Sequence, residues 1–201
     1  MRRIISRRAE KTDQVVVLPS SLEDPSKQPP GTYTVLLLTL CLSIFAFFAA
    51  LVAAFIWRSQ TLPYWDPVVV PKVLWLSTTL ILVSSGTFEI GRRLYAKGEW
   101  RWASRWLLLT ATIGAAFVAS QLTAWRRLMD QGAYLMDNPH GSFYYIFTGL
   151  HAAHLIGGMV ALFYVVFGPN RSRELVNVVG YYWHFLTVLW LILFAALLTI
   201  S

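Results

Sequence analysis

Charged residues and cysteine are both scarce in this chain of 201 residues. Asp, Glu, Lys and Arg together make up 13% of it, whereas soluble domains carry about 25%, so this is the composition of a membrane protein. The single cysteine, Cys41, excludes an intramolecular disulfide and cysteine-rich metal or iron–sulfur sites. No apolar stretch follows the basic N-terminus until Tyr33, so we expect no cleavable signal peptide.

Apolar sequence, in contrast, is abundant at 56% of all residues. It forms five runs of at least about 20 residues, the length that crosses about 30 Å of hydrocarbon as an α-helix. These runs cover residues 33–57, 73–95, 102–125, 142–167 and 176–200. A barrel would instead show alternating segments of about ten residues. The sequence therefore predicts an all-α integral membrane bundle of five transmembrane helices in residues 33–201, behind a polar tail in residues 1–32.

The basic residues indicate the orientation of the bundle. Of the 17 Lys and Arg residues, 13 lie in the tail, around the connection between the second and third runs, and around the connection between the fourth and fifth runs. By the positive-inside rule the N-terminus is then cytoplasmic and the C-terminus periplasmic. Because the positive charge lies in short segments between apolar runs, we expect no nucleic-acid partner. Trp and Tyr gather near the ends of the runs, Tyr144 among them, as in an interfacial aromatic belt.

Three of the four histidines lie well inside the last two apolar runs, where an ionisable side chain is costly without a partner. At a rise of 1.5 Å per residue, His154 and His184 both lie about 12 Å from the cytoplasmic boundary, and Glu89 about 9 Å from it. We therefore predict that these three side chains form a buried, hydrogen-bonded cluster. The buried polar residues that we single out in the bundle are Glu89, Gln121, His151, His154, His184 and Thr187.

The residue types and their spacing also allow three roles other than helix packing. His154 and His184 could ligate a haem from two helices, although only one such pair at equal depth exists. His151 and His154 could bind a metal ion, but a third ligand is missing from their surroundings in the sequence. Glu89 could relay protons. Hydrogen bonds between helices are the favoured interpretation because they need no further ligand.

Four segments resemble subunit III of the haem–copper respiratory oxidases, the cytochrome c oxidases and their quinol-oxidase relatives. TGLHAAHLIGG resembles the family signature T-G-x-H-x-x-H-x-x-x-G, and VGYYWHFLTVLWLILF resembles its last helix. SSGTFEIGRR is similar to its Ser–Ser–x–Thr helix, and Gly114, Phe117 and Gln121 to its G-x-x-F-x-x-x-Q helix. The chain departs from many members where they carry carboxylates: its first run has none, and Ala124 and Thr187 stand at two later positions.

The resemblance implies a five-helix bacterial subunit III in the inner (plasma) membrane. Such a subunit is an accessory part of a proton-pumping oxidase that reduces oxygen to water. It contains no catalytic residue, haem or copper, which lie in partner subunits, and it packs against catalytic subunit I, other oxidase subunits and bound phospholipid. It supports proton uptake. The resemblance also allows the oxidase to be part of a respiratory supercomplex. The alternatives are an accessory subunit of a nitric oxide reductase system and, less favoured, a haem-binding membrane cytochrome or a transporter.

Overall fold

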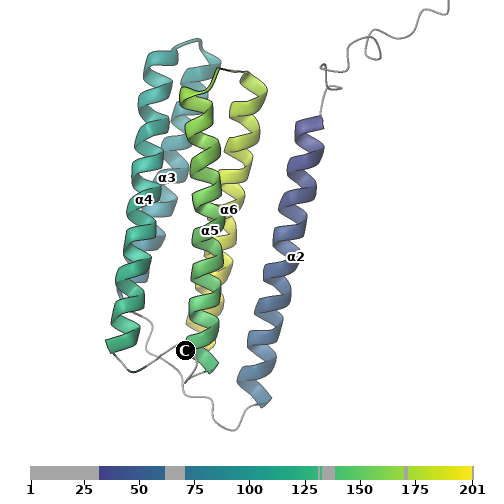
Figure 1. Cartoon of the computed structure of the whole chain (residues 1–201), viewed down its shortest axis with the longest axis vertical. Coiled ribbons are helices and arrows are strands. Elements are labelled where there is room, and N and C mark those ends of the chain that lie inside the picture. The colour runs from purple at the N-terminus through teal and green to yellow at the C-terminus, as the bar shows by residue number, and fades with distance from the viewer. Residues whose placement is uncertain (1–31, 62–70, 131, 133–138, 170–171, 201) are drawn as a thin grey trace, which may run out of the picture. The chain divides into compact units, whose positions relative to one another are not determined.

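The computed structural model describes residues 32–61, 71–130, 132, 139–169 and 172–200 (Figure 1). The predicted polar tail lies outside these residues, except for Thr32. The chain divides into Met1–Thr32 and Tyr33–Ser201, and the helices described below belong to the second unit, apart from Thr32 at the start of the first helix.

The described residues form five α-helices, all long and apolar enough to cross a membrane, and contain no strand. The helices are α2 (Thr32–Thr61), α3 (Val73–Ala96), α4 (Trp100–Asp130), α5 (Pro139–Phe167) and α6 (Arg173–Ile200). The predicted all-α class with five membrane-spanning helices is therefore confirmed. The helices extend beyond the apolar runs of the sequence, because helical hydrogen bonding continues into polar ends where the hydropathy has already fallen.

A tight turn at Gly98 joins α3 to α4. Gly98 has a φ of 84°, in the left-handed region that glycine adopts without steric cost, and its N–H donates to Tyr95 O at 3.0 Å. The Glu99 N–H donates to Leu94 O at 3.1 Å, which covers another carbonyl at the end of α3. The turn thereby returns α4 antiparallel to α3.

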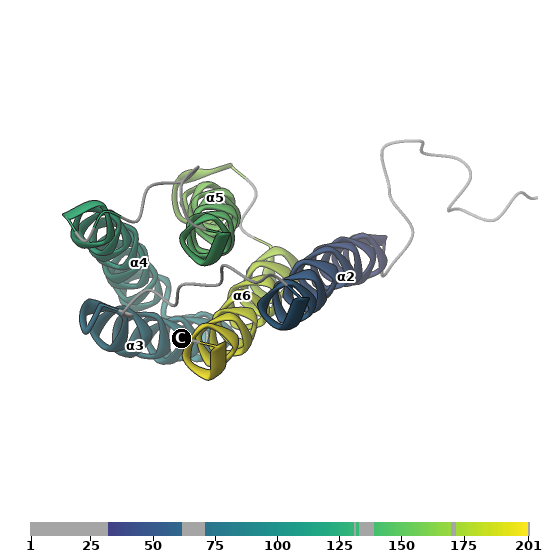
Figure 2. The ribbon, with the colours of Figure 1, turned by 90° about the horizontal axis from the view of Figure 1, so that it is seen from below.

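Helices α3 to α6 form a ring in which each contacts two neighbours. Helix α3 contacts α4 and α6, and α5 contacts the same two helices. Figure 2 looks along the helices and shows this arrangement. Helix α2 packs through aromatic side chains: the ring of Phe48 lies 5.7 Å from that of His154, and the ring of Phe55 lies 5.4 Å from that of Phe147, both on α5.

Trp183 of α6 fills the centre of this helix ring and is fully buried. Its indole lies beside Phe88 of α3, with ring centroids 6.1 Å apart. On α4, a Cβ added to Gly114 would lie 3.1 Å from Trp183 Cη2, and on α5 a Cβ added to Gly158 would lie 3.5 Å from Trp183 Cε3. Two glycines therefore provide the space that this indole occupies, and Trp183 contacts all three other helices of the ring.

Replacing Gly158 with Val should destabilise the bundle, because the new methyl groups would overlap Trp183 and Tyr182, whose Cε1 would lie 3.3 Å from the added Cβ. Overpacking of this kind typically costs about 1–3 kcal/mol. The adjacent Gly157 has no heavy atom within 4 Å of an added Cβ, so Gly157→Val is a matched control with the same loss of helical freedom. Thermal unfolding followed by circular dichroism should give a clearly lower Tm for the first variant only; equal losses would contradict this packing.

Candidate functional site

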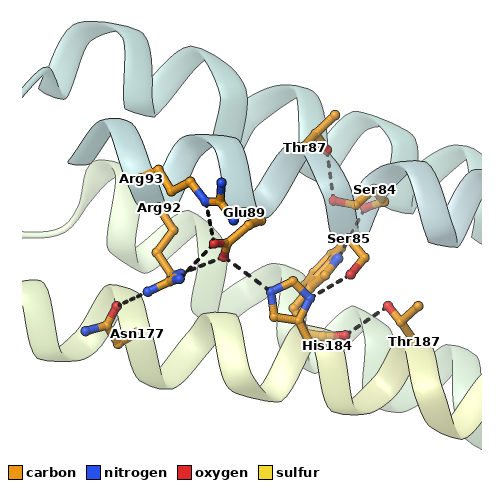
Figure 3. A network of polar contacts seen from close by, with 10 residues as sticks. Ser84, Ser85, Thr87, Glu89, Arg92, Arg93, Asn177, His184 and Thr187 are labelled. Atoms are coloured by element: carbon orange, nitrogen blue, oxygen red, sulfur yellow. Dashed lines mark hydrogen bonds and ion pairs between the residues drawn. The ribbon is translucent and has the colours of Figure 1, made fainter. Parts of the chain in front are cut away.

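An ion-pair network lies near one end of α3. The carboxylate of Glu89 accepts hydrogen bonds from Arg92 Nε and Nη2 at 2.7 and 2.8 Å, and from Arg93 Nε at 2.7 Å. Arg92 Nη1 also donates to Asn177 Oδ1 of α6 at 3.3 Å, so the network joins two helices. Because the three charged residues are spaced i, i+3 and i+4, one helical turn brings them together. Figure 3 shows both arginine side chains turned toward Glu89.

His184 of α6 lies beside this network. Its Nδ1 is 2.6 Å from Ser85 Oγ, and its Nε2 is 3.8 Å from Glu89 Oε2 (Figure 3). If the Ser85 hydroxyl donates to Nδ1, the imidazole proton sits on Nε2 and points toward the carboxylate. The side chain of His184 is 35% exposed and that of Glu89 is 25% exposed, so this site lies at the edge of the helix contact rather than in its centre.

The structure brings Glu89 and His184 together but places His154 elsewhere. His154 Nδ1 is 2.7 Å from Leu150 O of its own helix, and its ring packs edge-on against Phe48 of α2. Equal depth in the membrane was the reason to group His154 with His184. The two side chains nevertheless point to different neighbours, because depth does not determine the direction in which a helix turns a side chain.

The other predicted polar residues are buried away from this network. The Thr187 hydroxyl donates to Trp183 O, one turn earlier in α6, at 3.1 Å. His151 is fully buried, and its ring centroid lies 5.6 Å from that of Phe117 and 5.1 Å from that of Trp190. Gln121 of α4 is 1% exposed.

Sequence reasoning missed the hydrogen bonds that tryptophans donate across the helix ring. Trp183 Nε1 donates to Ser84 Oγ at 3.2 Å, and Trp190 Nε1 donates to Thr78 Oγ1 at 3.0 Å, both from α6 to α3. The spacing of seven residues between these tryptophans was the available signal, because it places both indoles on one helix face. A buried indole N–H usually finds an acceptor.

Hydroxyl pairs add to this set. Ser77 Oγ and Ser120 Oγ lie 2.7 Å apart, and Thr87 Oγ1 and Thr110 Oγ1 lie 2.9 Å apart, which joins α3 to α4 at two levels. Tyr144, assigned above to the interfacial belt, is 1% exposed and faces the interior instead. The belt assignment is wrong for this residue, since nearness to a helix end does not specify the face on which a side chain lies.

Within the described ranges, three or more His, Cys, Asp or Glu side chains nowhere gather into a group that could hold a metal ion. The two histidines considered for haem ligation contact different residues, His184 with Ser85 and His154 with Leu150 O and Phe48. The fold and these contacts define a multi-pass helical membrane protein whose polar side chains join neighbouring helices.

Comparison with known proteins specifies the family. The family model described as cytochrome c oxidase subunit III matches residues 32–200. A probable cytochrome c oxidase subunit 3 from Nocardia farcinica is 34% identical over 162 residues, which are 75% of this chain and 79% of the relative. The cytochrome c oxidase subunit 3 of Thermostichus vulcanus is 28% identical over 87% of this chain and 90% of its own length. The chain belongs to the cytochrome c oxidase subunit III family.

Replacing His184 with Leu should weaken the contact between α3 and α6, because Ser85 loses its partner and Glu89 loses the nearby imidazole. The expected cost is about one to a few kcal/mol. It would be measured as loss of the subunit from the oxidase complex with increasing detergent, at unchanged haem content. His154→Phe is the control, since it removes only a hydrogen bond within α5 and keeps an aromatic ring beside Phe48 of α2. Haem lost from the complex of the His184 variant would contradict a packing role.

Replacing Glu89 with Gln should leave the guanidinium groups of Arg92 and Arg93 without their carboxylate partner. For partly exposed pairs of this kind we expect a loss of about 1 kcal/mol, smaller at high salt. Glu99→Gln is the control. Glu99 lies in the exposed turn after α3 and forms no ion pair with the residues that the structure describes, so this variant removes the same charge with little effect on stability. Chemical unfolding at low and high salt measures both; equal effects of the two variants would show that the network adds nothing.

Proposed function

We propose that this chain is the accessory subunit III of a proton-pumping terminal oxidase that reduces oxygen to water. In this role it stabilises catalytic subunit I and supports proton uptake, without a redox centre of its own. The main support is the match of the family model to residues 32–200, which includes all five described helices. The oxidase is an enzyme complex, and this chain is proposed to be one of its non-catalytic parts.

The contacts of the histidines support a subunit without a redox centre. His184 lies within hydrogen-bonding distance of Ser85, His154 of Leu150 O, and His151 is enclosed by two aromatic rings. Of these three imidazoles, those of His184 and His154 have a protein partner for one ring nitrogen, that of His151 packs between aromatic rings, and they do not contact one another in these interactions. We place the haem and copper of the complex in partner subunits.

The charge pattern supports an orientation in a bacterial inner membrane. With 13 of 17 Lys and Arg residues in the tail and in the connections on the same side, we propose a cytoplasmic N-terminus and a periplasmic C-terminus. One of these residues, Arg173, donates from Nη2 to Ala96 O at 2.7 Å and so neutralises the carbonyl end of α3. Basic residues at this end therefore serve the fold as well as the topology.

An apolar groove between α2 and α6 supports the binding of phospholipid. It has a volume of about 280 Å³ and is lined only by apolar side chains. Phe45, Phe48, Ala49, Val52, Ala53 and Ile56 line it from α2, and Leu189, Ile192 and Leu193 from α6. Such a surface suits an acyl chain, which needs no hydrogen bond. The outer face of α2 exposes further large apolar side chains to lipid or to a partner subunit.

Purification of a tagged chain from membranes tests the assignment most directly. We expect an oxidase catalytic subunit to co-purify, with oxygen consumption in the purified fraction. The Gly158→Val variant should retain less of that subunit than the matched Gly157→Val variant, because only the first disturbs the helix ring. Recovery of a nitric oxide reductase catalytic subunit instead would contradict the proposal.

A further inference from the structure

Three buried side chains on α4 and α5 have polar atoms that lack a hydrogen-bond partner among the residues the structure describes. The atoms are Gln121 Oε1 and Nε2, Tyr144 Oη, and His151 Nδ1 and Nε2. Each of these residues is at most 1% exposed. Buried polar groups in proteins are almost always hydrogen-bonded, to protein or to ordered water, so a group of five unpaired atoms calls for a ligand.

The three residues lie along one contact between α4 and α5. Phe117 and Trp125, one helical turn before and after Gln121, contact His151 and Thr148 of α5, respectively. Gln121 is therefore level with the segment from Thr148 to His151. Thr148 and His151 are three residues apart, which places their side chains on one face of α5.

Tyr144 continues this face, because it lies one turn before Thr148 in α5 and is buried with it. The polar groups next to it are already engaged. The Thr148 hydroxyl donates to Tyr144 O at 2.8 Å and accepts from Trp125 Nε1 at 2.9 Å. The ring of Trp190 lies against His151, but its indole N–H already donates to Thr78 Oγ1.

We propose that Gln121, Tyr144 and His151 bind internal water molecules between α4 and α5. A neutral imidazole needs one donor and one acceptor, and the amide of Gln121 and the hydroxyl of Tyr144 need both as well. Water supplies both functions in a small volume and typically makes about three hydrogen bonds when buried. A side chain of another subunit does not reach these atoms, because each has less than 1 Å² of accessible surface. This site does not depend on the proposed function.

X-ray radiolytic footprinting of the intact complex, read by mass spectrometry, tests the site. Hydroxyl radicals form from water, so a buried side chain is oxidised quickly only where a water molecule is bound beside it. After each rate is divided by the intrinsic reactivity of its residue type, we expect Tyr144 and His151 to be oxidised several-fold faster than Phe147, which is equally buried on the same helix. Oxidation of Tyr144 and His151 no faster than that of Phe147 would overturn the proposal in favour of a direct contact between Gln121 and His151.

A substitution separates bound water from general penetration of the bundle. Gln121→Leu removes both amide atoms and adds no readily oxidised group, so oxidation of His151 should fall several-fold. Asn177→Leu, in the Arg92 network, should leave it unchanged. Unchanged oxidation of His151 in the Gln121 variant would contradict the assignment of Gln121. If that variant fails to assemble, the comparison of Tyr144 with Phe147 in the unaltered complex still decides whether water is bound.

Discussion

The contact of Trp183 with the other members of the helix ring is the interaction on which the rest of the structure depends. Its indole fills the space left by Gly114 and Gly158 and donates its N–H to Ser84. In a membrane, lipid is as apolar as the helix surfaces, so burial from water does not drive helices together. Close packing and hydrogen bonds between helices must supply the stabilisation, and Trp183 provides both at the centre of the ring.

The same requirement explains why so many polar side chains lie in spanning helices. Ser77 with Ser120 and Thr87 with Thr110 join α3 to α4, and the Arg92–Asn177 and Ser85–His184 contacts join α3 to α6. Polar contacts therefore join α3 to both α4 and α6. Such a bundle is held together by polar contacts between its own helices.

The helices were predictable from the sequence because a run of about 20 apolar residues has one stable solution in lipid. The approach of Glu89 to His184 followed from their depth, which chain position and helical rise determine. His154 and Tyr144 were misplaced because the direction of a side chain also depends on how each helix is rotated against its neighbours. The hydrogen bond between Trp183 and Ser84 was missed for the same reason: both residues stand in segments that resemble the family, but these segments do not show which way each side chain points.

We propose that the intramembrane histidines pack helices together and bind no redox cofactor. Quantifying haem and copper per catalytic subunit in oxidase purified with and without this chain tests that claim most directly. Equal amounts in the two preparations are the predicted result. The loss of one haem or copper for each chain removed, regained when the chain is added back, would contradict it.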